Sequence, residues 1–160
     1  MNAMVNLVPV TEEEFLAFVD ASVKNYAEEK VKSGNWPEEG SLERSRREFK
    51  SLLPDGKDSK DNYIYKIVDS KRKERVGTIW VAIRVENDLP GAFIYDITVG
   101  EKFRGKGYGK RAMQELEKVV KNLGYDRISL HVFGHNKVAF SLYQSLDYQV
   151  TNILMSKTLK

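Results

Sequence analysis

Hydrophobic and polar residues repeat with different periods along the 160-residue chain, and these periods predict its elements. Apolar residues spaced three and four apart favour a helix that ends near Lys32 and opens with a capping box of Thr11 and Glu14. A break at 33–37 separates it from a second helix that starts at Ser41. The N-terminal part is therefore predicted to be mainly helical.

Strand patterns dominate the middle of the chain. The segments 63–68 and 75–85 read as strands, and 5–10 reads as a short edge strand before the first helix. The polar run 54–61 predicts a mobile loop. The segment 93–99 is almost continuously apolar, which favours a central strand that is covered on both faces.

The C-terminal part returns to helix patterns. One stripe has spacings of four, three and four, typical of core packing: Ala112, Leu116, Val119 and Leu123. Gly124 is a suitable end for that helix. A strand at 127–133, a helix at 136–146 and a last strand or strands within 149–159 follow. Asp147, after the last helix, tolerates the left-handed conformation a turn requires.

These elements predict a mixed α/β fold, with a twisted sheet that carries helices on both faces. The length suffices for one domain and is short for two, so we expect residues 1–160 to form a single domain. Hydrophobic residues make up 41% and charged residues 31% of the chain, as is typical of soluble globular proteins.

Composition narrows the function classes. The net charge of +3 comes from 26 basic and 23 acidic residues, too small an excess to indicate nucleic acid. Without cysteine the chain has no disulfide, thiolate nucleophile or thiolate zinc site. It shows no signal peptide pattern and no apolar run that could span a bilayer, so we expect a cytoplasmic protein without a metal or a membrane partner.

The turn Arg104-Gly105-Lys106-Gly107-Tyr108-Gly109 is the most informative stretch. It lies between an apolar strand and an amphipathic helix, so the first N–H groups of the helix can bind an anion. Five cations surround it: Lys102, Arg104, Lys106, Lys110 and Arg111. A solvated glycine loop is the alternative, but the strand, the helix and the cations together favour a phosphate site.

Two phosphate-binding templates fail. A P-loop requires Ser or Thr where Arg111 stands, and its first glycine would be Arg104. A dinucleotide-binding turn requires a third glycine where the chain has Lys110 or Ala112. A third template, Arg/Gln-x-x-Gly-x-Gly/Ala, is met by Arg104, Gly107 and Gly109.

With this motif the chain resembles the GNAT N-acetyltransferase superfamily, whose members bind acetyl-CoA. The segment from Asn136 to Tyr143 is similar to the superfamily's Asn-x-x-Ala-x-x-x-Tyr segment. The resemblance covers roughly the C-terminal two-fifths of the chain and is closest to small single-domain bacterial members. It implies a mostly antiparallel sheet with a splayed strand pair that holds the cofactor.

The resemblance also implies where acetyl-CoA binds. The pyrophosphate would lie on the backbone of Arg104, Gly105, Lys106, Gly107, Tyr108, Gly109 and Lys110. The pantetheine arm would pair like an extra strand with Ile97, Thr98 and Val99, in an opening beside the strand at 127–133. The Val99 N–H would polarise the thioester carbonyl, an interaction worth about 3 kcal/mol.

The helix at 136–146 supplies further expected site residues. Tyr143 would be the general acid that protonates the CoA thiolate, because a phenol with a pKa of about 10 keeps its proton at neutral pH. Asn136 either caps the helix or holds the pantetheine arm, and both roles are compatible. Ala139 and Phe140 would line the cofactor, although Phe140 is equally suited to the core.

The sequence leaves the general base open. Asp96 lies inside an apolar strand, which favours a perturbed pKa and a function, although it could cap a neighbour instead. His131, in the next strand, could relay a proton near neutral pH, although a lone strand histidine is more often a core residue. Water could suffice for an amine with a low pKa.

We therefore expect an acetyl-CoA-dependent N-acetyltransferase in which a primary amine attacks directly in a ternary complex. The acceptor would lie between the first two helices and the sheet, with Tyr26, Trp36 and Trp80 either lining the site or packing in the core. The alternatives are a CoA-binding sensor without catalysis and, less favoured, a nucleic-acid-binding module. The partners would be acetyl-CoA and an amine that the sequence does not identify, and an exposed last strand could support a homodimer.

Overall fold

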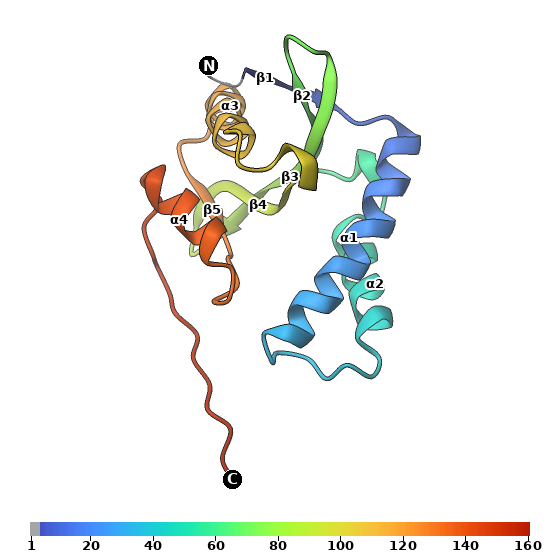
Figure 1. Ribbon diagram of the computed structural model, residues 1–160, viewed down its shortest axis with the longest axis vertical. Helices are drawn as coiled ribbons and strands as arrows, with labels where there is room; N and C mark the ends of the chain where they lie inside the picture. Colours follow the sequence, from blue (N-terminus) through green and yellow to red (C-terminus); the bar gives the residue numbers. More distant parts are fainter. Residues whose placement is uncertain (1–3) are drawn as a thin grey trace.

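The computed structural model describes residues 4–160, and its centre is a five-stranded sheet (Figure 1). The strands follow the spatial order β1-β2-β3-β4-β5. Consecutive strands from β1 to β4 pair antiparallel, and β4 and β5 pair in parallel. The bounds are β1 (Val5–Pro9), β2 (Asn62–Asp69), β3 (Glu74–Glu86), β4 (Leu89–Val99) and β5 (Ile128–Leu130). The mixed, mostly antiparallel architecture confirms the predicted fold class.

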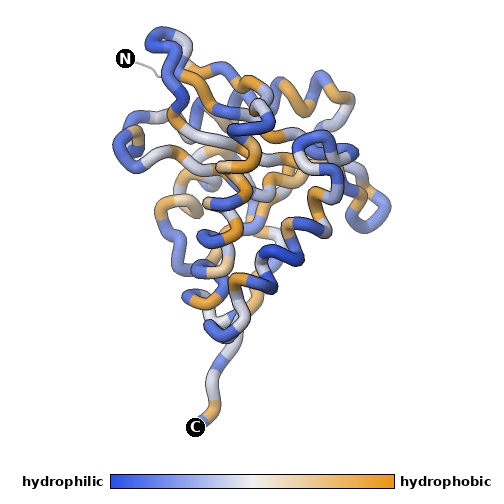
Figure 2. The backbone as a smooth tube through the Cα atoms, turned by 90° about the vertical axis from the view of Figure 1, so that its right-hand side faces the viewer, coloured by the Kyte–Doolittle hydropathy of each residue, from blue (hydrophilic) through white to orange (hydrophobic). Residues whose placement is uncertain are grey.

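Helices cover both faces of the sheet, as predicted (Figure 1). One face carries α1 (Glu12–Lys32) and α2 (Ser41–Leu52), and the other carries α3 (Tyr108–Asn122) and α4 (Lys137–Ser145). Short 3-10 turns, η1 (Gly56–Asp58) and η2 (Glu101–Phe103), precede β2 and the glycine turn. Hydrophilic stretches lie mostly in the outer turns of the chain (Figure 2). No helix within residues 4–160 is long and apolar enough to cross a membrane.

The sheet separates two hydrophobic clusters. On one face α3 buries Ala112 and Leu116 of the predicted stripe, both at 0% exposure, together with Met113 and Val120, whereas Leu123 of that stripe is 38% exposed. On the other face Trp80 is 1% exposed and packs against Phe49 and Tyr95, with ring centroids 5.5 and 4.5 Å away. The aromatic side chains considered for the acceptor site are thus mainly core residues, since Trp36 is also only 6% exposed.

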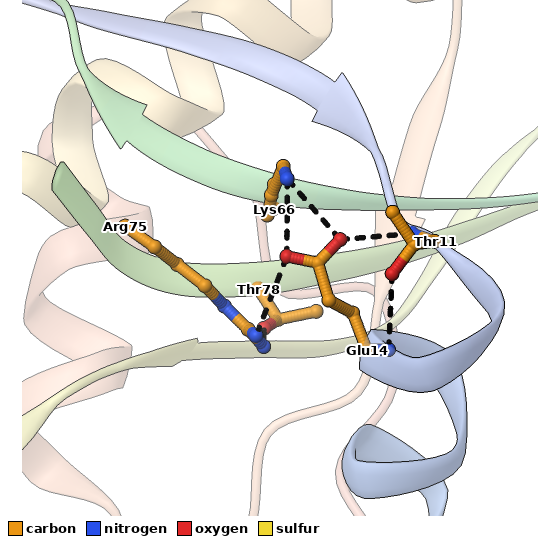
Figure 3. A network of polar contacts seen from close by, with 5 residues as sticks. All are labelled: Thr11, Glu14, Lys66, Arg75 and Thr78. Carbon is orange, nitrogen blue, oxygen red and sulfur yellow. Dashed lines mark hydrogen bonds and ion pairs between the residues drawn. The ribbon is translucent and has the colours of Figure 1, made fainter. Parts of the chain in front are cut away.

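A polar network fastens the start of α1 to the sheet (Figure 3). The predicted capping box is present: Glu14 N–H donates to Thr11 Oγ1 at 3.2 Å, and Thr11 N–H donates to Glu14 Oε1 at 2.8 Å. Lys66 Nζ, from β2, donates to both Glu14 carboxylate oxygens at 3.1 and 3.0 Å. Because these donors favour the ionised carboxylate, the pKa of Glu14 falls to about 2.

Two predictions for the C-terminal part need correction. The strand expected at 127–133 covers only Ile128–Leu130. The strand expected within 149–159 is absent: residues 149–160 are exposed and carry no helix or strand. The reason is physical, because strand propensity forms a strand only where a neighbouring edge accepts it, and after Asp147 (φ 68°) the chain leaves the body of the molecule (Figure 1).

Candidate cofactor-binding and active site

Strands β4 and β5 pair over three positions and then diverge. Their register runs from Ala92 opposite Ile128 to Ile94 opposite Leu130, whereas β4 continues to Val99. The edge of residues 95–99 that faces β5 therefore has no strand partner in the described part of the chain. We call the opening between residues 95–99 and residues 131–135 the wedge.

A β-bulge marks the point where the strands separate. Trp80 of β3 lies opposite Asp96, and Val81 lies opposite Ile94, so Tyr95 is the extra residue of β4. Bulges bend a strand and redirect its side chains, and they are frequent beside active sites. Because opposite residues share a face, Asp96 lies on the α1/α2 face with Trp80.

The backbone of β4 directs polar groups into the wedge at alternate residues. Gly100 N–H donates to the Val76 carbonyl at 2.8 Å, which makes Gly77 and Val99 a non-hydrogen-bonded antiparallel pair. The N–H and C=O groups of Val99 therefore point away from β3, and those of Ile97 do the same. Thr98 lies between them, and its backbone groups face β3.

The glycine turn places the N-terminus of α3, which has no side-chain cap, beside the end of β4. Gly105 (φ 73°) and Gly107 (φ 87°) are both left-handed, a conformation that costs glycine least. Gly107 is the N-cap of α3 and makes no side-chain hydrogen bond to the first turn, because glycine has no side chain to supply one. The N–H groups at the start of α3 are thus available to an anion, where the helix dipole is positive. A Cβ built on Gly109 would lie 3.9 Å from Val99 Cγ2, so the helix begins beside the wedge.

The cations of the turn have different environments. Arg104 Nε donates to the Val99 carbonyl at 3.0 Å, which ties the turn to the end of β4. Lys102 Nζ lies 3.8 Å from Glu74 Oε1. Lys106 and Lys110 are exposed and form no ion pair with any residue of the described chain. Both charges lie in or beside the turn that the sequence predicts to bind phosphate.

The buried side chain of Tyr108 anchors the glycine turn to the sheet, a role that the sequence did not predict. Its side chain is buried, and its hydroxyl donates to Asp69 Oδ2 at the end of β2. Asp69 Oδ1 also accepts the N–H groups of Lys71 and Arg72 at 2.9 and 3.0 Å. The hydrogen bond from Tyr108 lowers the pKa of Asp69 and raises that of Tyr108. Only the backbone of Tyr108 faces the proposed ligand, and no local pattern links residues 39 positions apart.

Tyr143 lies on α4, on the same face of the sheet as α3. It is 9% exposed, and its hydroxyl forms no hydrogen bond among residues 4–160. Burial, and then the charge of Asp96, raise the pKa of Tyr143 to about 12. The phenol therefore keeps its proton at neutral pH, and its pKa depends on whether Asp96 is charged.

The two candidate bases lie on opposite sides of the wedge. Asp96, on β4, is partly buried and accepts a hydrogen bond from Thr98 Oγ1 at 3.2 Å. Burial raises the pKa of Asp96 to about 6. His131 follows β5, and partial desolvation of its ring, followed by the charge of Lys30, lowers its pKa.

The start of α4 meets the wedge from the other side. Asn136 is the N-cap, and its Oδ1 accepts the Ala139 N–H at 3.2 Å. The capping role considered for Asn136 is thus present, and it leaves the amide NH₂ group free to donate. Ala139 and Phe140 are partly buried, and Ala139 packs against the same cluster as Tyr143.

The site thus combines an open strand edge, a helix N-terminus that can bind an anion and a buried tyrosine. The sequence and fold that produce it can be compared with those of known proteins. Residues 24–148 match the acetyltransferase (GNAT) family. The chain belongs to this family. It is therefore an acetyltransferase, an enzyme that transfers acetyl groups.

Two relatives match nearly the whole length of this GNAT chain. The protein named "Uncharacterized N-acetyltransferase YdgE" of Bacillus subtilis is 40% identical over 153 residues, which cover 96% of this chain and 97% of YdgE. The crystal structure of YycN, also from Bacillus subtilis, superposes with a TM-score of 0.90 at 37% identity and covers 98% of this chain and 99% of YycN. An acetyltransferase structure from Pyrococcus furiosus gives a TM-score of 0.71 at 26% identity, over 97% of this chain and 99% of that one.

Proposed function

We propose that this protein is an acetyl-CoA-dependent N-acetyltransferase in which a primary amine attacks acetyl-CoA directly in a ternary complex. The observation that supports it most is the meeting of two features in the wedge: the outward backbone groups of Ile97 and Val99, and the uncapped N-terminus of α3. The first suits an amide-containing arm, and the second suits a pyrophosphate. The two relatives named above carry the N-acetyltransferase or acetyltransferase description.

The residues present fit acetyl-CoA at both ends. The proposed pyrophosphate site is the backbone of residues 104–110, with Lys106 and Lys110 as free charges. The proposed pantetheine site is the edge of Ile97 and Val99, closed on the far side by Asn136, Ala139 and Phe140. Acetyl-CoA supplies the thioester whose carbonyl carbon the amine attacks.

The proposed chemistry requires one proton to leave and one to arrive. The Val99 N–H, directed into the wedge, stabilises the negative charge that develops on the carbonyl oxygen. Asp96 takes a proton from the attacking amine as the C–N bond forms. Tyr143 gives its proton to the sulfur as the C–S bond breaks. His131 and water remain alternatives to Asp96.

The carboxyl group of Asp96 and the phenol of Tyr143 interact electrostatically, and in the proposed mechanism this interaction assists turnover. The negative charge of Asp96 is one of the causes that raise the pKa of Tyr143. When Asp96 accepts the amine proton this charge disappears, so Tyr143 becomes a stronger acid at the step that needs it. In the proposed mechanism, deprotonation of the acceptor therefore favours protonation of the leaving group.

A thiol-release assay with a panel of amines tests the proposed function directly. Because the chain has no cysteine, a thiol reagent reports released CoA without background from the protein. The panel should include polyamines, amino acids, peptides with free N-termini or lysines, and aminoglycosides. Thiol release that depends on an amine supports the proposal. Tight acetyl-CoA binding with no release for any amine would indicate a CoA-binding sensor instead.

A further inference from the structure

Lys30, in the C-terminal half of α1, is a half-buried cation that has no carboxylate partner. Its Nζ lies near three aromatic rings, 5.5 Å from the centroid of Tyr26, 5.6 Å from that of Trp36 and 6.0 Å from that of Phe133. It forms no ion pair with any carboxylate of residues 4–160. Ring faces offset part of the cost of withdrawing an ammonium group from water. The partner that this environment lacks is an anion.

The carboxylates closest to Lys30 in this region are engaged by other groups. Glu29, the preceding residue, forms an ion pair with His135 after β5. Burial, and then the charge of Glu48, raise the pKa of Tyr26 to about 12, so Glu48 lies beside the Tyr26 hydroxyl. Neither carboxylate pairs with the Lys30 ammonium group, whose charge therefore stays available to a ligand.

Lys30 borders the wedge on the face of the sheet where Asp96 lies. Phe133, whose ring it contacts, belongs to the wall of residues 131–135, and the charge of Lys30 reaches His131 in the same wall. The C-terminal half of α1 thus lies across from the loop between β5 and α4 (Figure 1). The opposite face of the sheet carries α3, α4 and the proposed pyrophosphate site. An acceptor would therefore approach Asp96 from the side of Lys30.

One unpaired ammonium group suits a ligand with one negative charge. A lysine ammonium is a compact charge with three donors on a flexible stem, so it can pair with a carboxylate. A phosphate ester carries more than one negative charge at neutral pH and would need further cations. A polyamine or an aminoglycoside carries only positive charges, which Lys30 would repel. The charge at this position thus favours a carboxylate among the possible groups on an amine acceptor.

We propose that Lys30 binds a carboxylate of the acceptor, and that the acceptors are amines that also carry a carboxylate, as amino acids and peptides do. The inference rests on the proposed function, because it names the acceptor class of the same site. The amine would lie at Asp96 and the carboxylate at Lys30, on the side of the wedge away from α3. Lys30 is thus a specificity-determining residue that takes no part in proton transfer.

Matched acceptor pairs test this acceptor class. Each pair is an amino acid or a dipeptide and its C-terminal amide, which lacks the negative charge. The proposal expects kcat/KM for at least one carboxylate to exceed that for its amide about 10-fold or more. Amidation lowers the pKa of a nearby amine and leaves more of it neutral, so this effect opposes the expected preference. If amines are acetylated but no carboxylate is preferred, this inference is overturned and the proposed function stands.

Variants of α1 test the residue. Lys30→Met removes the charge and keeps an unbranched side chain beside the rings, so it should abolish the preference, mainly through KM. Lys30→Arg should restore most of it. The matched control is Lys24→Met on the same helix, because Lys24 is 60% exposed and pairs with Asp20 at 3.7 Å; it should keep the preference. A preference that persists in Lys30→Met, or that Lys24→Met loses equally, overturns the assignment.

A binding measurement decides the inference even if no amine is acetylated, a result by which the proposed function alone would fail. The chain has two histidines, so NMR can follow the His131 ring, assigned with His131→Gln. Desolvation and then the charge of Lys30 lower the pKa of His131, so an anion bound at Lys30 should raise that pKa. Acetylated glycine or acetylated diglycine should do so, and their amides should not. Equal responses to acids and amides, no response to either acid, or a response that persists in Lys30→Met overturns the inference.

Discussion

At the scale of single residues, the account depends most on two groups that the fold holds in unfavourable surroundings. Tyr143 and Asp96 are both shifted against ionisation, with pKa values raised to about 12 and about 6. Burial is the first cause in each case. Groups with strongly shifted pKa values cluster at functional sites, which supports the proposed chemical role of both residues.

Tyr143→Phe should lower kcat about 100-fold, because a positioned general acid contributes at least that much. The affinity for acetyl-CoA should stay unchanged, since the ring remains and only the hydroxyl is lost. Steady-state rates and calorimetric titration measure the two effects. Tyr148→Phe is the matched control, because its ring lies 6.0 Å from that of Tyr143 and it has no assigned role. Equal rates for Tyr143→Phe and wild type would remove Tyr143 as the acid.

Asp96 predicts a pH profile for the reaction. Only its ionised form can accept a proton, so kcat/KM should rise with pH and level off above about 6, the raised pKa. In Asp96→Asn this rise of kcat/KM with pH should disappear, and the plateau value of kcat/KM should fall about 100-fold. The parallel variant His131→Gln should keep the rise with pH. If the rise is instead lost in His131→Gln and retained in Asp96→Asn, His131 is the base.

Asp96 also predicts a dependence of stability on pH. Its folded pKa of about 6 exceeds the reference value of 3.8, so ionised Asp96 destabilises the fold. This cost is absent below 3.8 and complete above about 6. Asp96→Asn should therefore unfold at a higher temperature than wild type at pH 7.5 and at a similar temperature at pH 4, as thermal denaturation can measure. Asp126→Asn, at an exposed position, should change neither.

At the scale of elements, the two ends of α3 offer a matched pair of glycines. Gly107 (φ 87°) begins the helix beside the wedge, and Gly124 (φ 95°) follows its far end. A Cβ at either position would meet no atom within 4 Å, so valine is disfavoured only by the positive φ. Gly107→Val and Gly124→Val should each lower stability by about 1 to 3 kcal/mol.

Only Gly107→Val should also weaken acetyl-CoA binding, by 10-fold or more at about 1.4 kcal/mol for each factor of ten. The reason is that a changed turn misdirects the N–H groups at the start of α3. Titration of both variants with acetyl-CoA gives the comparison. Equal affinity in the two variants would separate the glycine turn from the phosphate site.

The attachment of α1 to the sheet carries a separate prediction. Glu14→Gln should lower stability at pH 7.5 by about 2 kcal/mol, because Lys66 and the Thr11 N–H lose an ionised partner. The pKa of Glu14 is lowered from 4.5 to about 2, so its contribution is complete above 4.5 and disappears as the pH falls to about 2. Urea unfolding at several pH values measures this. Glu12→Gln, in the same helical turn, should have no such effect; an equal loss there would contradict the assignment.

Local rules predicted the elements whose causes are local. The capping box of Thr11 and Glu14, the helix after the glycine turn and the left-handed Asp147 all depend on residues within four positions, and all are present. The link between Tyr108 and Asp69 and the bulge at Tyr95 depend on residues from different strands. No period in the sequence carries that information, so both had to be found in the structure.

At the scale of the whole molecule, the comparisons and the wedge support each other. The GNAT family match accounts for acetyl transfer, and the unpaired edge of β4 is where we propose that the ligand completes the sheet. The predicted last strand was wrong for a related reason. Its residues have strand propensity, but no neighbouring strand edge pairs with them in the described structure. Sequence patterns predict which segments can pair, and they do not say whether a partner edge lies within reach.

The central claim is that the wedge binds acetyl-CoA, and calorimetric titration of the purified protein with acetyl-CoA tests it most directly. The account predicts one site per chain with a Kd on the order of micromolar, near −8 kcal/mol. It also predicts that this affinity falls 10-fold or more in Gly107→Val and is kept in Gly124→Val. A folded wild-type protein that binds neither acetyl-CoA nor CoA would contradict the account, because the wedge and the glycine turn would then have no ligand in common.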